Sequence, residues 1–434
     1  MPVQKVLAAC CKDVVAGPEN PPNKNLEVIL SQKNERPLMK RKVFIIIENS
    51  TFPSDPRVRN EALALHRNGY QVTVLCPRSK RSSLGHEVIE GIHVYRHPKV
   101  QQGSTRFGYL LEYSLALFWE LCYSSWIYLC HGFHVIQGCN PPDTIFLVAL
   151  PFKLLGVKYI FDQHDANPEL YVSKFDKRGF LHKVLLVFEK LTYRHSDVVL
   201  ATNESYRELA LSRGGVPPQD VFIVRNGPQE SFKAVSANPA RKHGKSYLVG
   251  YVGHMDVQEG LDILLDVALR VKQMGRTDVH FTCVGGGPQL AALRGMVRAK
   301  GLTETVNFPG WVPDLELLEI LSSADVCVNP DKPSEMNDVS TMIKIMEYMA
   351  LGKPIVQFES KEGRFSAQEA SLYSSTTNRV NDFADKILWL LDNPEQRRKM
   401  GEFGRSRIER ELAWEYSVPY LLAAYQRAFD KRGS

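Results

Sequence analysis

Three side chains near position 345 combine a hydroxyl, a cation and a carboxylate. Ser340, Lys344 and Glu347 are spaced by four and three residues, and this spacing places side chains on one face of a helix. The free N–H groups and the dipole at a helix N-terminus attract phosphate, and a carboxylate farther along the face could accept hydrogen bonds from a ribose diol. The pattern therefore suits a sugar-nucleotide diphosphate. A capped amphipathic helix with one intrahelical Lys–Glu pair would give the same pattern.

The stretch that positions these side chains reads as loop, helix, turn and strand. We expect Asp338 or Ser340 to cap the helix, because a short side-chain oxygen accepts a bond from a free N–H group of the first turn. Gly352 then supplies a left-handed C-cap, and Pro354 prevents the helix from continuing. A buried strand opens at Ile355.

Length and composition indicate an ordinary globular protein. At 434 residues the chain is long enough for two domains with large cores, and 44% hydrophobic with 24% charged residues is typical of a soluble protein. The formal charge of +6 permits attraction to anionic lipid or a phosphorylated substrate, but does not indicate nucleic acid as a partner. The eight cysteines form no CxxC pair and no zinc spacing, so we expect no metal and a reducing, cytoplasmic location.

Residues 1–38 are polar and lack periodicity, so we expect a disordered tail, with Met39 as an alternative start of translation. Only six residues precede the lipobox-like Leu7–Cys10, which leaves no room for the apolar region of a signal peptide. We therefore expect no secretory signal.

The first half of the chain opens with a βαβ pattern. Lys42–Ile47 is a near-continuous apolar run, typical of a parallel strand covered on both faces. A helix over about Arg57–Asn68 and a strand over Tyr70–Leu75 follow. Such a unit predicts a parallel sheet with right-handed crossovers, and ligands bind at the carboxyl ends of its strands.

The loop after the first strand is therefore a candidate site, whose polar residues are Ser54, Asp55, Arg57 and Arg59. Either arginine, close to a helix N-terminus, could hold a phosphate. The alternative is ion pairing at the surface with Asp55 and Glu61.

His164 and Asp165 follow the strand predicted over Lys158–Asp162. This is where α/β enzymes place site residues, and an imidazole can act as acid or base near neutral pH. The alternative is a structural pair whose hydrogen bonds are satisfied within the protein.

The most apolar helix is predicted over Phe107–Cys130. Glu112, Glu120 and several serines make it a poor membrane-spanning segment, so we expect a core helix. The alternative is a partly exposed aromatic face that rests on a membrane.

The second half repeats the α/β pattern after a polar stretch over Asn226–Lys245. It restarts at Tyr247 with a strand, a glycine turn and a helix, and a later strand runs into Gly285–Pro288, where glycines allow close approach of a ligand. We therefore predict an α/β protein with two Rossmann-like, doubly wound parallel-sheet domains facing a cleft. The predicted boundaries are a tail over 1–38, a first domain over 39–228, a linker over 229–246, a second domain over 247–412, and a last helix over 413–434 that packs back toward the first domain.

Together these motifs resemble family 4 retaining glycosyltransferases of the GT-B fold. The resemblance runs from Met39 to the C-terminus. It rests on the first strand and loop, the His164–Asp165 strand end, the YVG opening of the second domain, VGGGP at Val284–Pro288, and IMEYMA with GKP over 345–354. The chain is similar to a bacterial branch with the NDVSTM and KIMEYMALGKPIV signature.

The resemblance implies roles for individual residues. Glu347 matches the second glutamate of the family's paired-glutamate motif, which holds the nucleotide ribose. His164 matches a histidine near the donor sugar, and with Asp165 and Lys344 it is expected at the reaction centre. Further donor-side residues are expected to be Gly253, His254, Gly286, Asn337, Asp338, Ser340 and Thr341, and the loop after the first strand is expected on the acceptor side.

The resemblance also implies the reaction. A nucleotide-sugar would donate its sugar, with retention of configuration, to a glycan or lipid-linked acceptor in surface or exopolysaccharide biosynthesis. Helix N–H groups and cations would stabilise the leaving diphosphate, with no metal and no cofactor. A lipid-linked acceptor implies peripheral contact with the cytoplasmic face of the inner membrane.

Three departures from the family pattern stand out. The first glutamate of the pair is replaced by Val339, so Asp338, Asn337 or Glu335 would have to substitute for it. The Arg and Lys that normally neutralise the diphosphate are replaced by His254 and Glu259, which makes Lys344 the candidate cation. Ser54 and Asp55 stand where the family has a glycine pair.

Two other functions remain open at this point. A GT-B-fold epimerase would bind the same donor but would release an epimerised nucleotide sugar. A non-catalytic GT-B scaffold would bind no sugar nucleotide at all.

Overall fold

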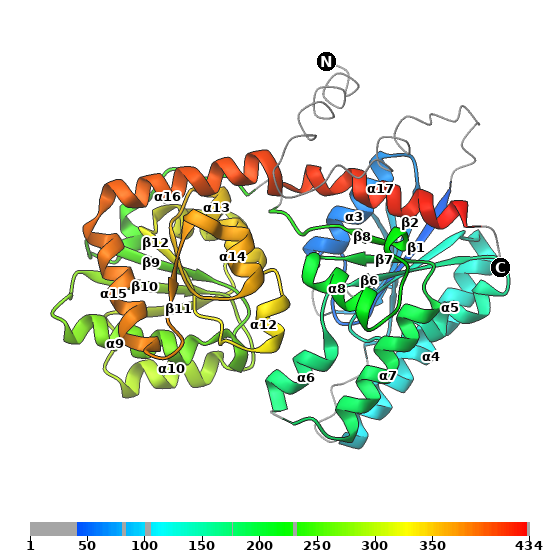
Figure 1. Cartoon of the computed structure of the whole chain (residues 1–434), viewed down its shortest axis with the longest axis horizontal. Coiled ribbons are helices and arrows are strands. Elements are labelled where there is room, and N and C mark those ends of the chain that lie inside the picture. Colours follow the sequence, from blue (N-terminus) through cyan, green and yellow to red (C-terminus); the bar gives the residue numbers. More distant parts are fainter. Residues whose placement is uncertain (1–40, 80–83, 100–105, 176, 229–231, 432–434) are drawn as a thin grey trace, which may run out of the picture. The chain divides into compact units, whose positions relative to one another are not determined.

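The computed structural model describes residues 41–79, 84–99, 106–175, 177–228 and 232–431. The predicted tail over 1–38 lies outside these residues. Two parallel β-sheets, each covered by helices on both faces, make up the described chain (Figure 1). The predicted α/β class with two doubly wound sheets is confirmed.

The first sheet has eight strands in the order β3-β4-β2-β1-β5-β6-β7-β8. Every neighbouring pair is parallel except β3 with β4. The antiparallel edge strand β3 is absent from the sequence-based prediction. The strands are β1 Lys42–Ile47, β2 Gln71–Pro77, β3 His86–Ile89, β4 Ile92–His97, β5 Val135–Cys139, β6 Lys158–Gln163, β7 Val198–Ala201 and β8 Val221–Ile223.

Helices cover both faces of the first sheet because its central strands are apolar on both sides. One face packs against α3 (Pro56–Arg67) and α17 (Trp414–Asp430). The other face packs against α4 Arg106–His131, α5 Phe146–Lys153, α7 Phe180–His195 and α8 Glu204–Ser212. The short α6 (Asn167–Phe175) follows β6.

The second sheet has six strands, all parallel, in the order β11-β10-β9-β12-β13-β14. Its strands are β9 Tyr247–Val252, β10 Val279–Val284, β11 Val306–Gly310, β12 Val326–Asn329, β13 Ile355–Phe358 and β14 Ser371–Ser374. Its helices are α9 Leu261–Gln273, α10 Leu290–Ala299, α11 Asp314–Ser323, α12 Glu335–Val339, α13 Ile343–Ala350, α14 Lys361–Ala367, α15 Arg379–Asp392 and α16 Pro394–Arg407.

The predicted helix from Ser340 is wrong at its start. A short helix, α12, ends at Val339, Ser340 has extended backbone (φ −98°, ψ 134°), and α13 begins only at Ile343. Ser340 therefore does not share a helical face with Lys344 and Glu347. The end of the helix is as predicted, because Gly352 has φ +67° and donates to the Met349 carbonyl.

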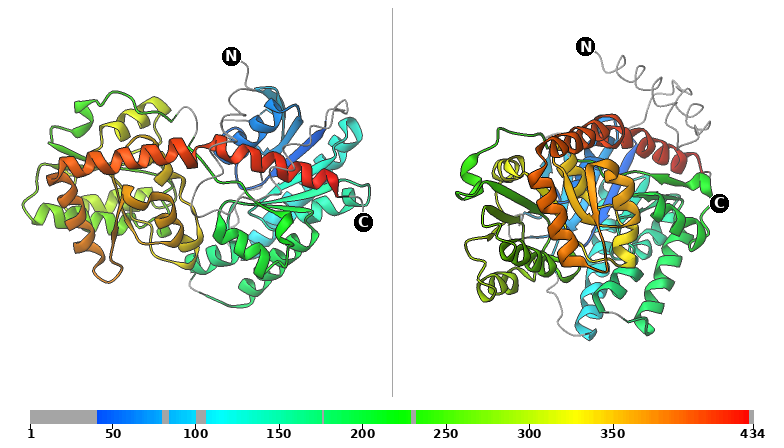
Figure 2. Two further views of the ribbon diagram at one scale, coloured as in Figure 1. Left: turned by 45° about the horizontal axis from the view of Figure 1, so that its top comes forward. Right: turned by 60° about the vertical axis from the view of Figure 1, so that its left-hand side comes forward.

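The last helix, α17, belongs to the core of the first sheet. Leu421, Ala424, Tyr425 and Ala428 are fully buried there or nearly so, and α17 lies beside α3 (Figure 2). A π-helical turn over Ile408–Leu412 separates it from α16. Among the described residues, no helix is both long and apolar enough to cross a membrane.

Candidate active site

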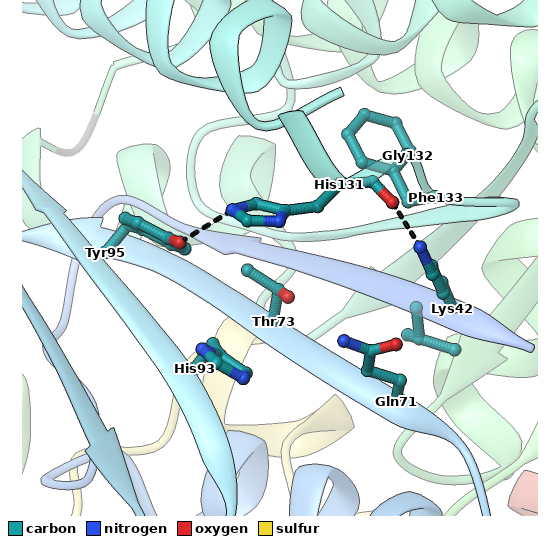
Figure 3. A pocket seen from close by; sticks show the side chains of 9 residues that line it. Lys42, Gln71, Thr73, His93, Tyr95, His131, Gly132 and Phe133 are labelled. Atoms are coloured by element: carbon teal, nitrogen blue, oxygen red, sulfur yellow. Dashed lines mark hydrogen bonds between the residues drawn. The ribbon is translucent and has the colours of Figure 1, made fainter. Parts of the chain in front are cut away.

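A small pocket at the amino ends of β1, β2 and β4 is too small to bind a nucleotide sugar (Figure 3). Its lining includes Lys42, Gln71, His93 and Tyr95, and the Tyr95 hydroxyl lies 3.1 Å from the His131 ring nitrogen. Its volume of about 20 Å³ holds about one water molecule. Open parallel sheets bind their ligands at the opposite, carboxyl ends of the strands, and the candidate site lies at those ends.

Glu347 is an unpartnered carboxylate on α13. Its side chain is half-buried and makes no hydrogen bond or ion pair with the described residues. Burial raises the pKa of Glu347 to about 7, although the nearby Lys344 cation acts in the opposite direction. The predicted intrahelical Lys–Glu pair is absent. A carboxylate that is partly dehydrated without a protein partner is free to accept hydrogen bonds from a ligand.

The start of α13 is likewise open. Met342 occupies the N-cap position, and no side chain caps the first turn. The alternative prediction of an amphipathic helix capped by Asp338 or Ser340 is therefore wrong. Free N–H groups at such a terminus, together with the helix dipole, form an anion site.

Lys344 is already neutralised by two carboxylates. Its ammonium group lies 2.8 Å from Glu259 and 2.7 Å from Asp331, and 5.0 Å from the centre of the Tyr251 ring. Only 9% of the Lys344 side chain is exposed. Burial alone would lower the pKa of Lys344, but the two carboxylates raise it well above its ordinary value. The prediction that Lys344 is a free cation for the diphosphate is therefore corrected, because it joins α13 to the loops after β9 and β12.

The polar side chains of the 337–341 segment bond mainly to the protein itself. Asn337 donates to the Lys332 carbonyl (2.8 Å), and Asp338 accepts from the Lys361 amide (2.8 Å). Ser340 donates to the Met336 carbonyl (2.7 Å), and Thr341 accepts from Asn203 (3.0 Å). These contacts explain why the backbone breaks before Ile343 instead of continuing as one helix.

Several hydrogen bonds join the segment before α13 and the start of α14 to residues that follow β7. Asn203 donates to the Val339 carbonyl (2.8 Å), and the Tyr206 hydroxyl lies 3.0 Å from Ser340 Oγ. Ser205 donates to Glu362 (2.6 Å). The segment that leads into α13 is thus fixed by residues of the first sheet as well as the second.

Loop glycines on the donor side pack against the chain itself. A Cβ atom on Gly286 would lie 2.5 Å from the Trp311 ring nitrogen, and one on Gly253 would lie 2.7 Å from the Tyr251 hydroxyl. Packing therefore explains both glycines without a ligand. The neighbouring His254 is exposed, and its side chain makes no hydrogen bond or ion pair with the rest of the described chain.

Arg57 lies at the centre of a buried ion cluster in the first sheet. It contacts Asp162 at 2.6 Å and Glu61 at 3.0 Å, and donates to the Val224 carbonyl (2.7 Å) and to Asn226 (2.9 Å). Only 3% of its side chain is exposed. The prediction that Arg57 holds a phosphate is therefore wrong in this geometry, and so is the alternative of pairing at the surface.

The other residues of the same loop take different roles. Asp55 caps α3 by accepting from the Val58 amide (2.9 Å), and Arg59 pairs with Glu90 (2.5 Å) near the surface. Ser54 is exposed. Of the four predicted acceptor-side residues, Ser54 is exposed, Asp55 and Arg59 are half-buried, and Arg57 is buried.

His164 is tied to the Arg57 cluster through Asp162. Its Nε2 atom lies 2.7 Å from the Asp162 carboxylate, and only 13% of its side chain is exposed. Burial alone would lower the pKa of His164, but the Asp162 carboxylate raises it above the ordinary value. Asn140 holds the backbone by accepting from the amides of His164 (2.6 Å) and Asp165 (3.1 Å). This arrangement orients the imidazole at the carboxyl end of β6, and burial raises the pKa of Asp165 beside it.

Sequence reasoning missed Asp162, Gln137, Tyr425 and Asp331. Gln137 donates to Glu61 (2.6 Å) and Asp162 (2.9 Å), and it accepts from the Tyr425 hydroxyl of α17. One signal was available, since Gln137 and Asp162 are polar residues inside otherwise apolar strands, and buried polar groups need partners. No sequence signal linked Tyr425 to them.

Two doubly wound parallel sheets, with the uncapped start of α13 beside the second, have the architecture of a GT-B glycosyltransferase. Comparisons with known proteins agree. Residues 54–227 match the family model described as a glycosyl transferase 4-like domain. Residues 246–393 match the model for glycosyl transferases group 1. The chain belongs to the family 4-like glycosyltransferases, which confirms the family and the GT-B fold expected from the sequence.

Individual relatives are distant. The chain is 23% identical to the alpha-D-kanosaminyltransferase of Streptomyces kanamyceticus, over 59% of this chain and 67% of the relative. It is 20% identical to the 2-deoxystreptamine glucosyltransferase of the same organism, over 64% and 73%.

Solved structures show the same fold. The sucrose-phosphate synthase from Thermosynechococcus elongatus superposes with a TM-score of 0.72 at 18% identity, covering 90% of this chain and 99% of that chain. The Anabaena protein HepE in complex with UDP-glucose gives a TM-score of 0.66 at 13% identity, covering 89% and 99%.

Proposed function

We propose that this glycosyltransferase moves a sugar from a nucleotide-sugar donor to a glycan or lipid-linked acceptor, with retention of configuration. The observation that carries the proposal is the uncapped start of α13 with the unpartnered Glu347 farther along the same helix. The first feature suits a diphosphate and the second a ribose diol. The relatives named as glycosyltransferases, and the structural neighbour bound to UDP-glucose, support the same class of donor.

In the proposed mechanism, the N–H groups of α13 and the exposed His254 stabilise the leaving diphosphate. Fixed dipoles aimed at developing charge are an effective way to lower the barrier. His164, held by Asp162, would act on the sugar at the reaction centre as a hydrogen-bond donor. Lys344 would position the loops around the diphosphate without contacting it, because its ammonium group is already paired with Glu259 and Asp331.

We propose that the transfer itself needs no metal ion and no cofactor. The support is the chemistry of the donor side, where Lys344 occupies both loop carboxylates, Glu259 and Asp331. Neutralisation of the diphosphate would then fall to the helix terminus rather than to a carboxylate-bound cation.

A thermal-shift panel of UDP-, GDP-, ADP- and dTDP-sugars tests the donor site, because a ligand that binds only the folded state raises the melting temperature. We expect a shift with one nucleotide, unchanged in EDTA. A shift that requires a divalent ion would contradict metal independence.

With the responding donor, the product is then analysed by NMR, where release of nucleotide diphosphate and a glycoside of unchanged anomeric configuration are expected. An epimerised nucleotide sugar as the product would favour the epimerase. No change in melting temperature with any donor would favour the non-catalytic scaffold.

We propose peripheral contact with the cytoplasmic face of the inner membrane, as part of surface or exopolysaccharide biosynthesis. Large apolar side chains of α4, α5 and α7 stand exposed, and so do two in the turn after α5; they include Phe118 (55%), Leu129 (84%), Leu154 (91%) and Phe180 (78%). Exposed apolar side chains of this size can interact with lipid. In a vesicle-flotation assay with anionic lipid, the protein is expected to float, and Phe180→Ser with Leu154→Ser to reduce flotation severalfold. Equal flotation of both proteins would count against this surface.

A further inference from the structure

A second group of buried polar residues lies away from the donor-side helix. Glu48 directly follows β1, His97 is the last residue of β4, and Glu120 lies in the middle of α4. Strand alternation turns His97 and Tyr95 toward α4, because Tyr95 packs on Trp126 of that helix. One oxygen or nitrogen atom from each of the three residues lies within 4.8 Å of the others.

These atoms receive no hydrogen bond from a donor group of the described chain. Glu120 is 1% exposed, and Glu48 Oε2 and His97 Nε2 are also buried. Burial, together with the neighbouring Glu48 carboxylate, raises the pKa of Glu120 well above its ordinary value. Ser124, one turn along α4 from Glu120, is fully buried with an unbonded hydroxyl. Buried polar groups without partners are costly, so such a cluster indicates that something absent from the chain itself completes it.

The orientation of His97 favours a cation as that component. Its Nδ1 atom lies 3.0 Å from the Pro98 carbonyl, so Nδ1 carries a proton and Nε2 faces Glu48 in the cluster. Metal-bound histidines commonly donate their other N–H group to a carbonyl in this way.

The spacing of the atoms agrees with this interpretation. His97 Nε2 and Glu48 Oε2 are 3.0 Å apart but are not aligned as a hydrogen bond. Two ligands at about 2.1 Å from one ion lie about 3.0 Å apart at an octahedral angle and about 3.4 Å apart at a tetrahedral angle. The separation of the two atoms therefore fits two ligands of one ion.

We propose that Glu48, His97 and Glu120 bind a divalent first-row metal ion. Two carboxylates and a neutral imidazole form a donor set that suits Zn²⁺ or Mn²⁺, and a divalent charge balances the two buried carboxylates. The ion would join the ends of β1 and β4 to α4, and it would hold the base of the loop that carries Ser54 and Asp55. The three ligands are far apart in the sequence, so they form none of the short spacings that indicate a metal site.

The test uses metal-free full-length protein and Zn²⁺ as the probe, with zinc content measured by mass spectrometry after gel filtration. We expect one bound equivalent in the wild type and a higher melting temperature with Zn²⁺. Glu120→Gln and, independently, His97→Gln should each weaken binding at least a hundredfold, since loss of a group that only hydrogen-bonds to a metal ligand already costs about 10–100-fold. Both changes preserve side-chain size, and either variant alone decides the question if the other does not fold.

A matched control separates this site from a second group, Cys139, Asp162 and His164, whose atoms also lie within metal-binding reach of one another. His164→Asn is expected to keep the bound equivalent, and X-ray absorption of the zinc protein should show nitrogen and oxygen ligands only. Loss of zinc in His164→Asn, a sulfur ligand, or no zinc bound at micromolar concentration would overturn the proposal. Absence of bound zinc would indicate instead that Glu48 and Glu120 share a proton as a carboxyl–carboxylate pair.

Discussion

Replacement of Lys344 by methionine is expected to lower the free energy of unfolding by about 3–5 kcal/mol. The ammonium group is enclosed by Glu259 and Asp331, so its removal leaves two neighbouring carboxylates, one of them fully inside the protein. Asp331 has only 5% of its side chain exposed, and burial already raises its pKa, with the charge of Glu259 adding to the effect. Urea denaturation at pH 7 measures the loss.

Charge removal is separated from lost packing by a double variant. Lys344→Met with Asp331→Asn leaves Glu259 as the lone carboxylate, and we expect it to recover more than half of the stability lost by Lys344→Met. Lys332→Met serves as the control, because Lys332 pairs with Asp262 where both side chains are largely solvated (29% and 44% exposed), and such pairs contribute less than about 1 kcal/mol. Additive losses in the double variant would show that the cluster does not act as a unit.

Glu347→Gln is expected to weaken donor binding by about 10- to 100-fold, since hydrogen bonds to a charged group contribute about 1.5–3 kcal/mol. The same change should stabilise the free protein at alkaline pH. The carboxyl pKa rises from its ordinary 4.5 to about 7 on folding, so ionised Glu347 destabilises the folded state progressively as pH rises between these values. We expect Glu347→Gln to gain about 1–3 kcal/mol over the wild type at pH 8 and nothing at pH 4.

Donor affinity provides the matching pH experiment. A nucleotide sugar has no group that titrates between pH 6 and 8, so wild-type affinity should fall as pH drops below about 7 and Glu347 takes up a proton. The Glu347→Gln variant should show no such slope. Glu359→Gln is the control, because that carboxylate is exposed and pairs with Arg364 at the surface. A variant that loses stability at pH 8, or that keeps wild-type affinity, would assign Glu347 to the framework of the fold.

The sequence predicted the fold well because strand burial is a local signal. β1 was expected at Lys42–Ile47 and is found there, since an apolar run covered on both faces has one simple interpretation. The start of α13 was missed because tertiary contacts decide it. Ser340 is a good N-cap residue by type, yet its hydroxyl bonds to Met336 and Tyr206 instead.

The site was predicted less completely, for a related reason. Glu347 and His164 lie where strand and helix ends place them, and those ends can be located from local patterns. The partners that decide whether a charge is free come from elsewhere in the chain. Lys344 appeared to be a free cation only because Asp331 lies in another loop, and Arg57 appeared exposed because Asp162 is more than a hundred residues away in sequence.

The placement of α17 has a consequence for how the protein is made. The strands of the first sheet are complete once residue 223 has left the ribosome, but the core on one of their faces includes Leu421, Ala424, Tyr425 and Ala428. The buried Gln137 also lacks its hydrogen bond from the Tyr425 hydroxyl until α17 has been synthesised. The amino-terminal half therefore cannot finish folding ahead of the carboxy-terminal half, as consecutive domains commonly do during translation. Until the last helix is synthesised, an apolar face of the nascent chain stays uncovered and open to chaperones.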